Sequence, residues 1–181
     1  MADSNPLPPL KRFITTHDDS GQAVFSSTPS DDLPFRDVPG ASFGLGYATD
    51  NFPANLNEDA DISAYQSFLE KPPGIVIHNG TVLRFVDVGP GHLSPMHRTV
   101  SLDYGVVIEG DIELVLDSGE TRQMKRGDVA IQRGTMHAWR NNSQTEWARL
   151  MFVLQHCKPV EVKGQELSED YGSMKGVPAS A

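Results

Sequence analysis

The chain has 181 residues, 38% of them hydrophobic and 22% charged, which suits one well-filled core and is short for two full domains. Its 24 acidic and 15 basic residues give a formal net charge of −9, so we expect neither nucleic acid nor membrane as a partner. Cys157 is the single cysteine, which excludes an internal disulfide and a thiolate cluster. The start MADSNPLPPLKRF has no apolar signal region, so we expect a cytoplasmic protein.

The first 74 residues predict an N-terminal arm, a hairpin and a wrapping segment. Two short β-prone runs within 12–26 flank the turn sequence DDSG, which is typical of a β-hairpin. The stretch 28–74 contains six prolines and no sustained period, apart from a short helical turn expected around 61–69. So long an irregular segment is unusual inside a compact domain, and we expect it to be either a lid or a subunit-interface strap.

From residue 75 onward the pattern is β-rich. Seven short segments with high β propensity follow one another to residue 157, separated by turns such as Asn79-Gly80 and Asp117-Ser118-Gly119. Many short strands with regular turns and no long amphipathic helix predict an all-β sandwich or barrel. We therefore expect a β-barrel domain over 75–157 and a polar C-terminal tail over 158–181.

Two segments within the predicted barrel resemble the two motifs of the cupin superfamily. The first is GHLSPMHRTVSLDYGVVIEG over 91–110, and the second is GDVAIQRGTMHAWRN over 127–141. Gly91, His97, Asp103 and Gly110 fall at the spacing of the first family motif. Gly127, Gly134, His137 and Asn141 fit the second, with its first gap one residue short and Gln132 where proline is usual.

This resemblance implies a double-stranded β-helix, or jelly-roll, barrel with a small-molecule pocket. It is similar to the short single-domain cupins of fungal and bacterial genomes, in which an N-terminal arm often pairs with a second subunit. The resemblance thus predicts a homodimer through the hairpin at 12–26. It also implies that a divalent metal, such as Zn, Fe, Mn or Ni, sits near the motif histidines in typical members.

The residues at the motif positions indicate a degenerate metal site. His97 and Thr99 share one face of a strand, as do His137 and Trp139, so these side chains are expected to point into the barrel together. His97, His137 and Asp103 are the candidate ligands. Thr99 stands where the family has a second histidine, and Asp103 is one methylene shorter than the family's glutamate, so metal binding is expected to be weakened or lost.

We expect an enzyme that acts on a small organic substrate, such as a secondary metabolite, without net oxidation: a lyase or isomerase that decarboxylates, dehydrates, isomerises or cyclises. His97 and His137 are the expected general acid and base, because imidazole titrates near neutrality. Asp103 would orient an imidazole or hold a metal. Thr99 and Gln132 would bind substrate oxygens, and Trp139 would form a wall. A non-catalytic sensor cupin and a metal-dependent dioxygenase remain alternatives, and His92 is expected in a solvent-exposed loop.

Overall fold

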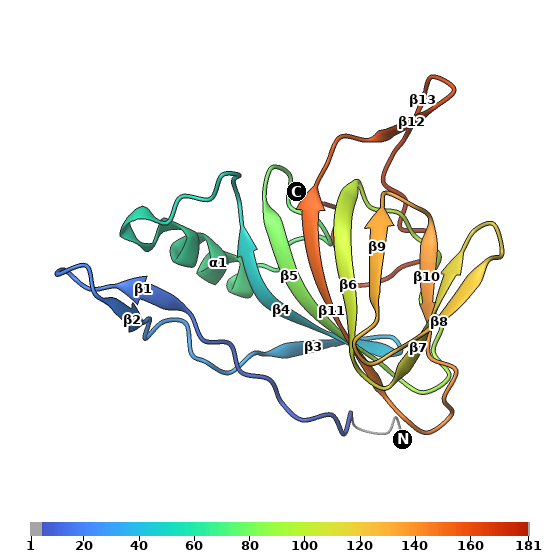
Figure 1. The fold of residues 1–181 in the computed structure, drawn as a ribbon, viewed down its shortest axis with the longest axis horizontal. Helices are drawn as coiled ribbons and strands as arrows, with labels where there is room; N and C mark the ends of the chain where they lie inside the picture. The colour runs from blue at the N-terminus through green and yellow to red at the C-terminus, as the bar shows by residue number, and fades with distance from the viewer. Residues whose placement is uncertain (1–4, 181) are drawn as a thin grey trace.

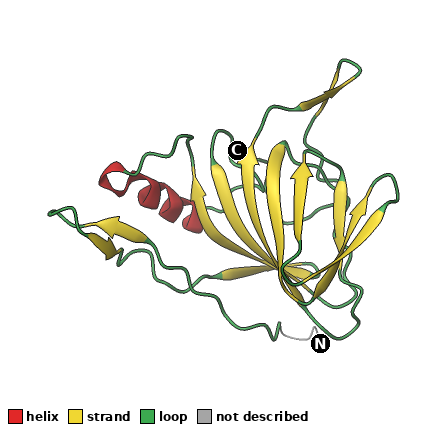
Figure 2. Cartoon of the chain, viewed as in Figure 1, coloured by secondary structure: helices red, strands yellow, loops and turns green. Residues whose placement is uncertain are grey.

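The computed structural model describes residues 5–180, and nearly all of its regular structure is β (Figures 1 and 2). One helix, α1 (Ala60–Glu70), follows a short 3-10 turn, η1 (Asn57–Asp59). The strands are β1 (Thr15–His17), β2 (Ala23–Phe25), β3 (Phe35–Val38), β4 (Ala41–Thr49), β5 (Thr81–Val88), β6 (Ser101–Glu109), β7 (Asp111–Leu116), β8 (Thr121–Lys125), β9 (Val129–Arg133), β10 (His137–Arg140), β11 (Ala148–His156), β12 (Val160–Val162) and β13 (Gln165–Leu167).

Two sheets form the body of the molecule, and their strands are antiparallel. The larger sheet has the order β3-β4-β5-β11-β6-β9, and the smaller has the order β10-β7-β8. The strands of the larger sheet curve around one side in Figure 1, with the smaller sheet beside β9. Buried and more exposed residues alternate along β6 and β9, as expected for strands with one face on a core. The predicted all-β jelly-roll architecture is confirmed.

The expected domain boundary at residue 75 is wrong, because strand β4 is an integral part of the larger sheet. β4 pairs with β5 along nearly its whole length, from Ala41 opposite Val88 to Thr49 opposite Thr81. β3 then pairs with β4 and forms the edge of the same sheet. The segment 28–74 is thus neither irregular throughout nor merely wrapped around the barrel.

The helix expected around 61–69 is confirmed as α1, which packs beside β4 (Figure 1). Tyr65 is its anchor: the side chain is fully buried and its hydroxyl donates a hydrogen bond to the carbonyl of Leu45 at 2.7 Å. Phe68 and Leu69 pack against the same core cluster. No helix within 5–180 combines the length and the apolar character needed to cross a bilayer.

The predicted hairpin is confirmed as β1 and β2, with Thr15 opposite Phe25, and it projects away from the sheets in Figure 1. Its aromatic side chains, Phe13 and Phe25, pack edge to face at 6.3 Å and remain largely exposed. Its proposed role in a homodimer stays a prediction.

The C-terminal segment is more than the polar tail expected from its composition. After the β12–β13 hairpin, the backbone of Asp170 pairs with Arg98 through two hydrogen bonds of 2.7 and 2.9 Å. Tyr171, Met174 and Val177 then pack against the hydrophobic core. The expectation of a separate tail is corrected accordingly: this segment helps to enclose the interior of the barrel.

Candidate functional site

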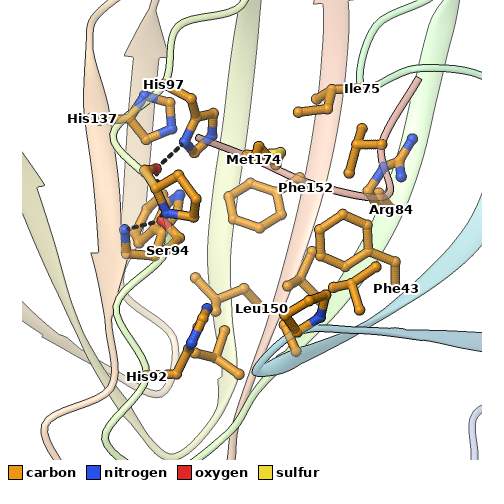
Figure 3. A pocket seen from close by; sticks show the side chains of 18 of the residues that line it. Phe43, Ile75, Arg84, His92, Ser94, His97, His137, Leu150, Phe152 and Met174 are labelled. Atoms are coloured by element: carbon orange, nitrogen blue, oxygen red, sulfur yellow. Dashed lines mark hydrogen bonds between the residues drawn. The ribbon is translucent and has the colours of Figure 1, made fainter. Parts of the chain in front are cut away.

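A cavity of about 260 Å³ lies between the faces of the two sheets. Apolar side chains form most of its wall, including Phe43, Leu150 and Phe152 (Figure 3). A few polar groups interrupt this surface, as is usual for a site that binds a small organic molecule. They comprise Arg84, His92, Ser94, His97, Asp103, His137, Ser173 and Lys175.

His97 and His137 are direct neighbours across an isolated antiparallel β-bridge, in which the segment before β6 meets β10. The backbone of each residue donates a hydrogen bond to the other, and both N···O distances are 2.9 Å. Because opposite residues of an antiparallel pair point to the same face, the imidazoles lie side by side, with ring centroids 4.4 Å apart. Figure 3 shows both rings at one end of the cavity. The sequence prediction that these histidines share a pocket is confirmed by their position.

Backbone carbonyls fix the orientation of both imidazoles. Nδ1 of His97 lies 2.8 Å from the carbonyl oxygen of Pro95, and Nδ1 of His137 lies 2.9 Å from that of Thr135. A carbonyl oxygen only accepts, so each Nδ1 carries the proton and each Nε2 of a neutral ring keeps a lone pair. These carbonyls, rather than Asp103, hold the rings in place.

Burial keeps both imidazoles neutral. Desolvation, and then the charge of the neighbouring His97, lowers the pKa of His137 to about 4. Desolvation also lowers the pKa of His97. Two adjacent rings in a dry site cannot both be protonated without strong repulsion. The pair therefore offers bases rather than cations at neutral pH.

Asp103 lies on the inward face of β6 and lines the same cavity. It is 3% exposed, and its Oδ1 has no hydrogen-bond partner within the described residues. Desolvation raises the pKa of this carboxyl to about 6, against the opposing effect of the Ser101 and Thr99 hydroxyls. A carboxyl that holds its proton into the mildly acidic range next to neutral imidazoles is an arrangement suited to acid–base chemistry.

Thr99 and Gln132 are buried, but neither is among the residues that line the cavity. Thr99 Oγ1 accepts a hydrogen bond from Ser101 at 2.8 Å, and Gln132 Oε1 accepts one from Thr135 at 2.5 Å. Gln132 is opposite Asp103 in the β6–β9 pair, and its Nε2 has no partner within 5–180. The Thr99 hydroxyl and the Gln132 amide oxygen thus already have partners within the protein. Their contact with a substrate stays a prediction.

Trp139 forms part of the cavity wall, as the sequence predicted. Its ring meets His137 edge to face at 5.8 Å and Phe152 at 5.4 Å, at interplanar angles of 83° and 61°. Its backbone exchanges hydrogen bonds of 2.9 Å with Ser94, whose Oγ is the acceptor from Trp139 N. The indole is therefore held rigidly beside the histidine pair.

The donor set fits a firmly held divalent metal poorly. Such a site needs at least three protein ligands, and residues 5–180 contain no group of three or more His, Cys, Asp or Glu side chains placed to hold one. Thr99 stands where the family has its second histidine, and its neutral hydroxyl accepts a hydrogen bond from Ser101. The degenerate metal site of His97, His137 and Asp103 stays a prediction, and we derive no chemical step through a metal.

Three contributors to the cavity were missed or misplaced by the sequence interpretation: Arg84, His92 and the segment around Met174. Arg84 carried a detectable signal, because it stands in phase with Val82 and Val86 on the buried face of β5. His92 lines the cavity and is half-buried, and desolvation lowers its pKa. Met174 lies far along the chain, and no local pattern marks it.

Comparisons with known proteins agree with this architecture. A family model described as "Cupin domain" matches residues 84–154. Phomopsin biosynthesis cluster protein D of Diaporthe leptostromiformis is 55% identical over 157 residues, which cover 86% of this chain and 83% of the relative. Cupin-domain-containing oxidoreductase virC of Hypocrea virens is 41% identical over 172 residues, or 91% of this chain and 86% of the relative. The chain belongs to the cupin family.

Among solved structures, the polyketide cyclase RemF from Streptomyces resistomycificus is similar at 18% identity and a TM-score of 0.46, covering 71% of this chain and 77% of that one. Oryzines biosynthesis cluster protein J of Aspergillus oryzae is a further sequence relative, 46% identical over 93% of this chain and 95% of its own length. The sequence relatives thus include proteins of biosynthesis clusters and cupin-domain oxidoreductases.

Proposed function

We propose that this protein is an enzyme that rearranges or cleaves a small organic intermediate of a biosynthetic pathway by moving protons, without net oxidation. The pair of adjacent imidazoles in an apolar cavity carries this proposal. Each ring presents an unprotonated Nε2, and the cavity also holds a carboxyl that retains its proton to about pH 6. The biosynthesis-cluster names of relatives at 46–55% identity support the substrate class.

In this mechanism, Nε2 of His137 removes a proton from a carbon acidified by a neighbouring carbonyl. The carboxylic acid of Asp103 delivers a proton to a second atom of the substrate. Protonation of carbon or of a carbonyl oxygen lets the substrate isomerise or cyclise, whereas protonation of a hydroxyl lets the C–O bond break and water leave. His97, whose ring lies 4.4 Å from that of His137, is placed to pass the captured proton on. No electron acceptor is consumed, because one proton leaves the substrate as another enters.

A second candidate is an oxidoreductase, and it is favoured by the names of relatives at 39–41% identity, which are cupin-domain-containing oxidoreductases. Such a reaction needs an oxidant or reductant in addition to the substrate. A non-catalytic sensor that binds a small ligand in the same cavity is the remaining alternative. The three functions differ in the fate of the ligand: the first exchanges its protons, the second changes its oxidation state, and the third leaves it unchanged.

The decisive experiment is NMR of the protein in D₂O with a panel of aromatic and polyketide-like carbonyl compounds. We expect one or more compounds to take up solvent deuterium or to convert with no change in oxidation state. His137→Asn and His97→Asn should each slow this by about 100-fold or more, as expected for loss of a general base. His17→Asn, in the exposed hairpin strand β1, is the matched control and should leave the rate unchanged.

The other outcomes separate the alternatives. Conversion only with added iron and oxygen, or with a nicotinamide cofactor, and with a product that has gained oxygen or lost two hydrogens, would replace the proposal by an oxidoreductase. Saturable binding across the panel with no deuterium uptake and no conversion would identify a sensor.

A further inference from the structure

Arg84 is a buried cation at the end of the cavity away from the histidines. It lies on β5 in phase with Val82 and Val86, and it is 8% exposed. Figure 3 shows it across the cavity from His97 and His137, with Phe152 and Met174 between them. Burial lowers the pKa of this guanidinium to about 10, so it still carries its charge at neutral pH. A permanent charge in such a place is costly unless something pairs with it.

Within the described residues, Arg84 has too few partners for its charge. A guanidinium has five N–H donors. Nη2 donates to the carbonyl of Gly74 at 2.7 Å, and the guanidinium carbon lies 5.6 Å from the centroid of the Phe43 ring. Nε has no partner, and none of the ion pairs in residues 5–180 includes Arg84. The neighbouring Arg36 adds positive charge rather than compensating it.

The charges along the cavity wall favour an anion at this end. The cavity wall contains two basic side chains, Arg84 and the exposed Lys175, and a single carboxyl, Asp103, which lies on the inward face of β6. The remaining wall near Arg84 is apolar, with Phe43, Ile75 and Val86. A planar guanidinium pairs with a carboxylate through two parallel hydrogen bonds and distinguishes it from a neutral amide.

We infer that Arg84 binds the carboxylate of the substrate, so that the protein acts on a small organic acid whose apolar body spans the cavity and whose other end reaches His97 and His137. This inference rests on the proposed function for the role of the histidines. The carboxylate site itself rests only on the burial, the missing partners and the position of Arg84. A cavity of about 260 Å³ limits the acid to a small molecule.

Calorimetric titration at pH 7 with matched probes tests the site. The probes are phenylalkanoic acids, from phenylacetate to 5-phenylvalerate, and the corresponding primary amides. We expect at least one acid to bind about 10- to 100-fold more tightly than its amide, which is the range expected for a buried charge-assisted hydrogen bond. Arg84→Gln should reduce this preference to less than about 3-fold, and Arg84→Lys should retain part of it.

Arg122→Gln is the control, because Arg122 is an exposed arginine of β8 and should leave the preference intact. Arg84→Met keeps an unbranched apolar stem and serves if the glutamine variant does not fold. Equal affinity of acid and amide for the wild-type protein, or a preference that survives in Arg84→Gln and Arg84→Met, would overturn the inference.

The deuterium experiment fails or succeeds independently of this one. A carboxylate preference lost in the Arg84 variants, without turnover of any compound, would support the acid site and count against the enzyme. Turnover of neutral substrates that depends on His137 and is unchanged in Arg84→Gln would support the enzyme and count against the acid site.

Discussion

The larger sheet buries one arginine on each of its faces, Arg84 of β5 and Arg149 of β11, and the two arginines differ in whether a carboxylate pairs with them. On one face, Arg149 of β11 meets Asp87 of β5 through two contacts of 2.6 Å, with both side chains at most 3% exposed. Arg149 also donates to the carbonyl of Pro8 and lies over the ring of Phe35. On the cavity face, Arg84 donates a hydrogen bond to the carbonyl of Gly74 and lies over the ring of Phe43.

This difference separates a structural charge from one that is held ready for a ligand. The Asp87–Arg149 pair satisfies its own charges and, through Pro8 and the amide of Asn5, ties the N-terminal arm to the sheet. Among residues 5–180, Arg84 and Asp103 each have a buried polar atom on the cavity face that finds no hydrogen-bond partner. A buried polar atom without a hydrogen-bond partner destabilises the fold, and such atoms are expected at functional sites.

The largest effect should come from breaking the paired face. Asp87→Leu leaves Arg149 as a buried lone cation, and we expect it to lower the free energy of unfolding by about 3–5 kcal/mol. Arg84→Met removes a charge that is already alone, and we expect it to change the free energy of unfolding by less than about 1 kcal/mol. Urea denaturation measures both. The double variant Asp87→Leu/Arg149→Met should recover most of the loss. Similar losses for Asp87→Leu and Arg84→Met would remove the distinction between the faces.

The next effect concerns the carboxyl of the cavity. The folded pKa of Asp103 is raised from 3.8 to about 6, so the native state prefers the protonated form, and the stability this contributes is lost as the pH rises through that interval. Asp103→Asn does not ionise. We expect the variant to be more stable than the wild type by about 3 kcal/mol at pH 7, from two pKa units at 1.36 kcal/mol each, and by almost nothing at pH 4.

Urea denaturation at several pH values measures this difference. The lowered pKa of His137 acts in the opposite direction, because its contribution is present above 6.5 and is lost as the pH falls toward 4. The variant should therefore show a stability that rises with pH between 4 and 6.5, whereas the two slopes partly cancel in the wild type. A constant difference between variant and wild type from pH 4 to 7 would contradict the raised pKa.

These contrasts also explain which features the sequence could reveal. His97 and His137 were predictable because each stands in a short motif whose strand alternation fixes its face. For Asp103 the sequence left two interpretations open, a ligand and a turn-capping residue, and the structure places it buried within β6. The pairing of the two imidazoles across the barrel depends on a register between segments 40 residues apart, which the family motif supplied and local pattern did not.

Strand β4 shows why other parts were missed. Its sequence, ASFGLGYAT, contains Gly44 and Gly46, which weaken a strand pattern. In the structure, a Cβ on Gly44 would lie 2.5 Å from Leu33 Cδ2, and one on Gly46 would lie 2.9 Å from Leu83 Cγ. The glycines are needed because neighbouring side chains fill the space, and that is a tertiary requirement. The approach of Ala179 to Gly74 is equally non-local.

The pH dependence of catalysis should follow the same two cavity groups. His137 acts as a base above about pH 4, and Asp103 acts as an acid below about pH 6. We therefore expect kcat/KM for deuterium uptake to pass through a maximum near pH 5 and to fall on both sides. In Asp103→Asn the decline above pH 6 should disappear and the maximum should be lower. A rate that keeps rising above pH 7 in the wild type would exclude Asp103 as the acid.

The smallest effect should distinguish the two aromatic rings that lie against the two arginines. Phe43→Leu removes the ring 5.6 Å from Arg84, and Phe35→Leu removes the ring 5.2 Å from Arg149. A cation–π contact contributes about 0.5–2 kcal/mol. We expect Phe43→Leu to weaken phenylalkanoate binding by about 2- to 10-fold while the preference for acid over amide remains. Phe35→Leu should lower stability by a similar free energy without changing that affinity. Calorimetric titration measures the affinity of both variants, and urea denaturation measures their stability. An equal loss of affinity in Phe35→Leu and Phe43→Leu would show that the two faces of the sheet are coupled rather than independent.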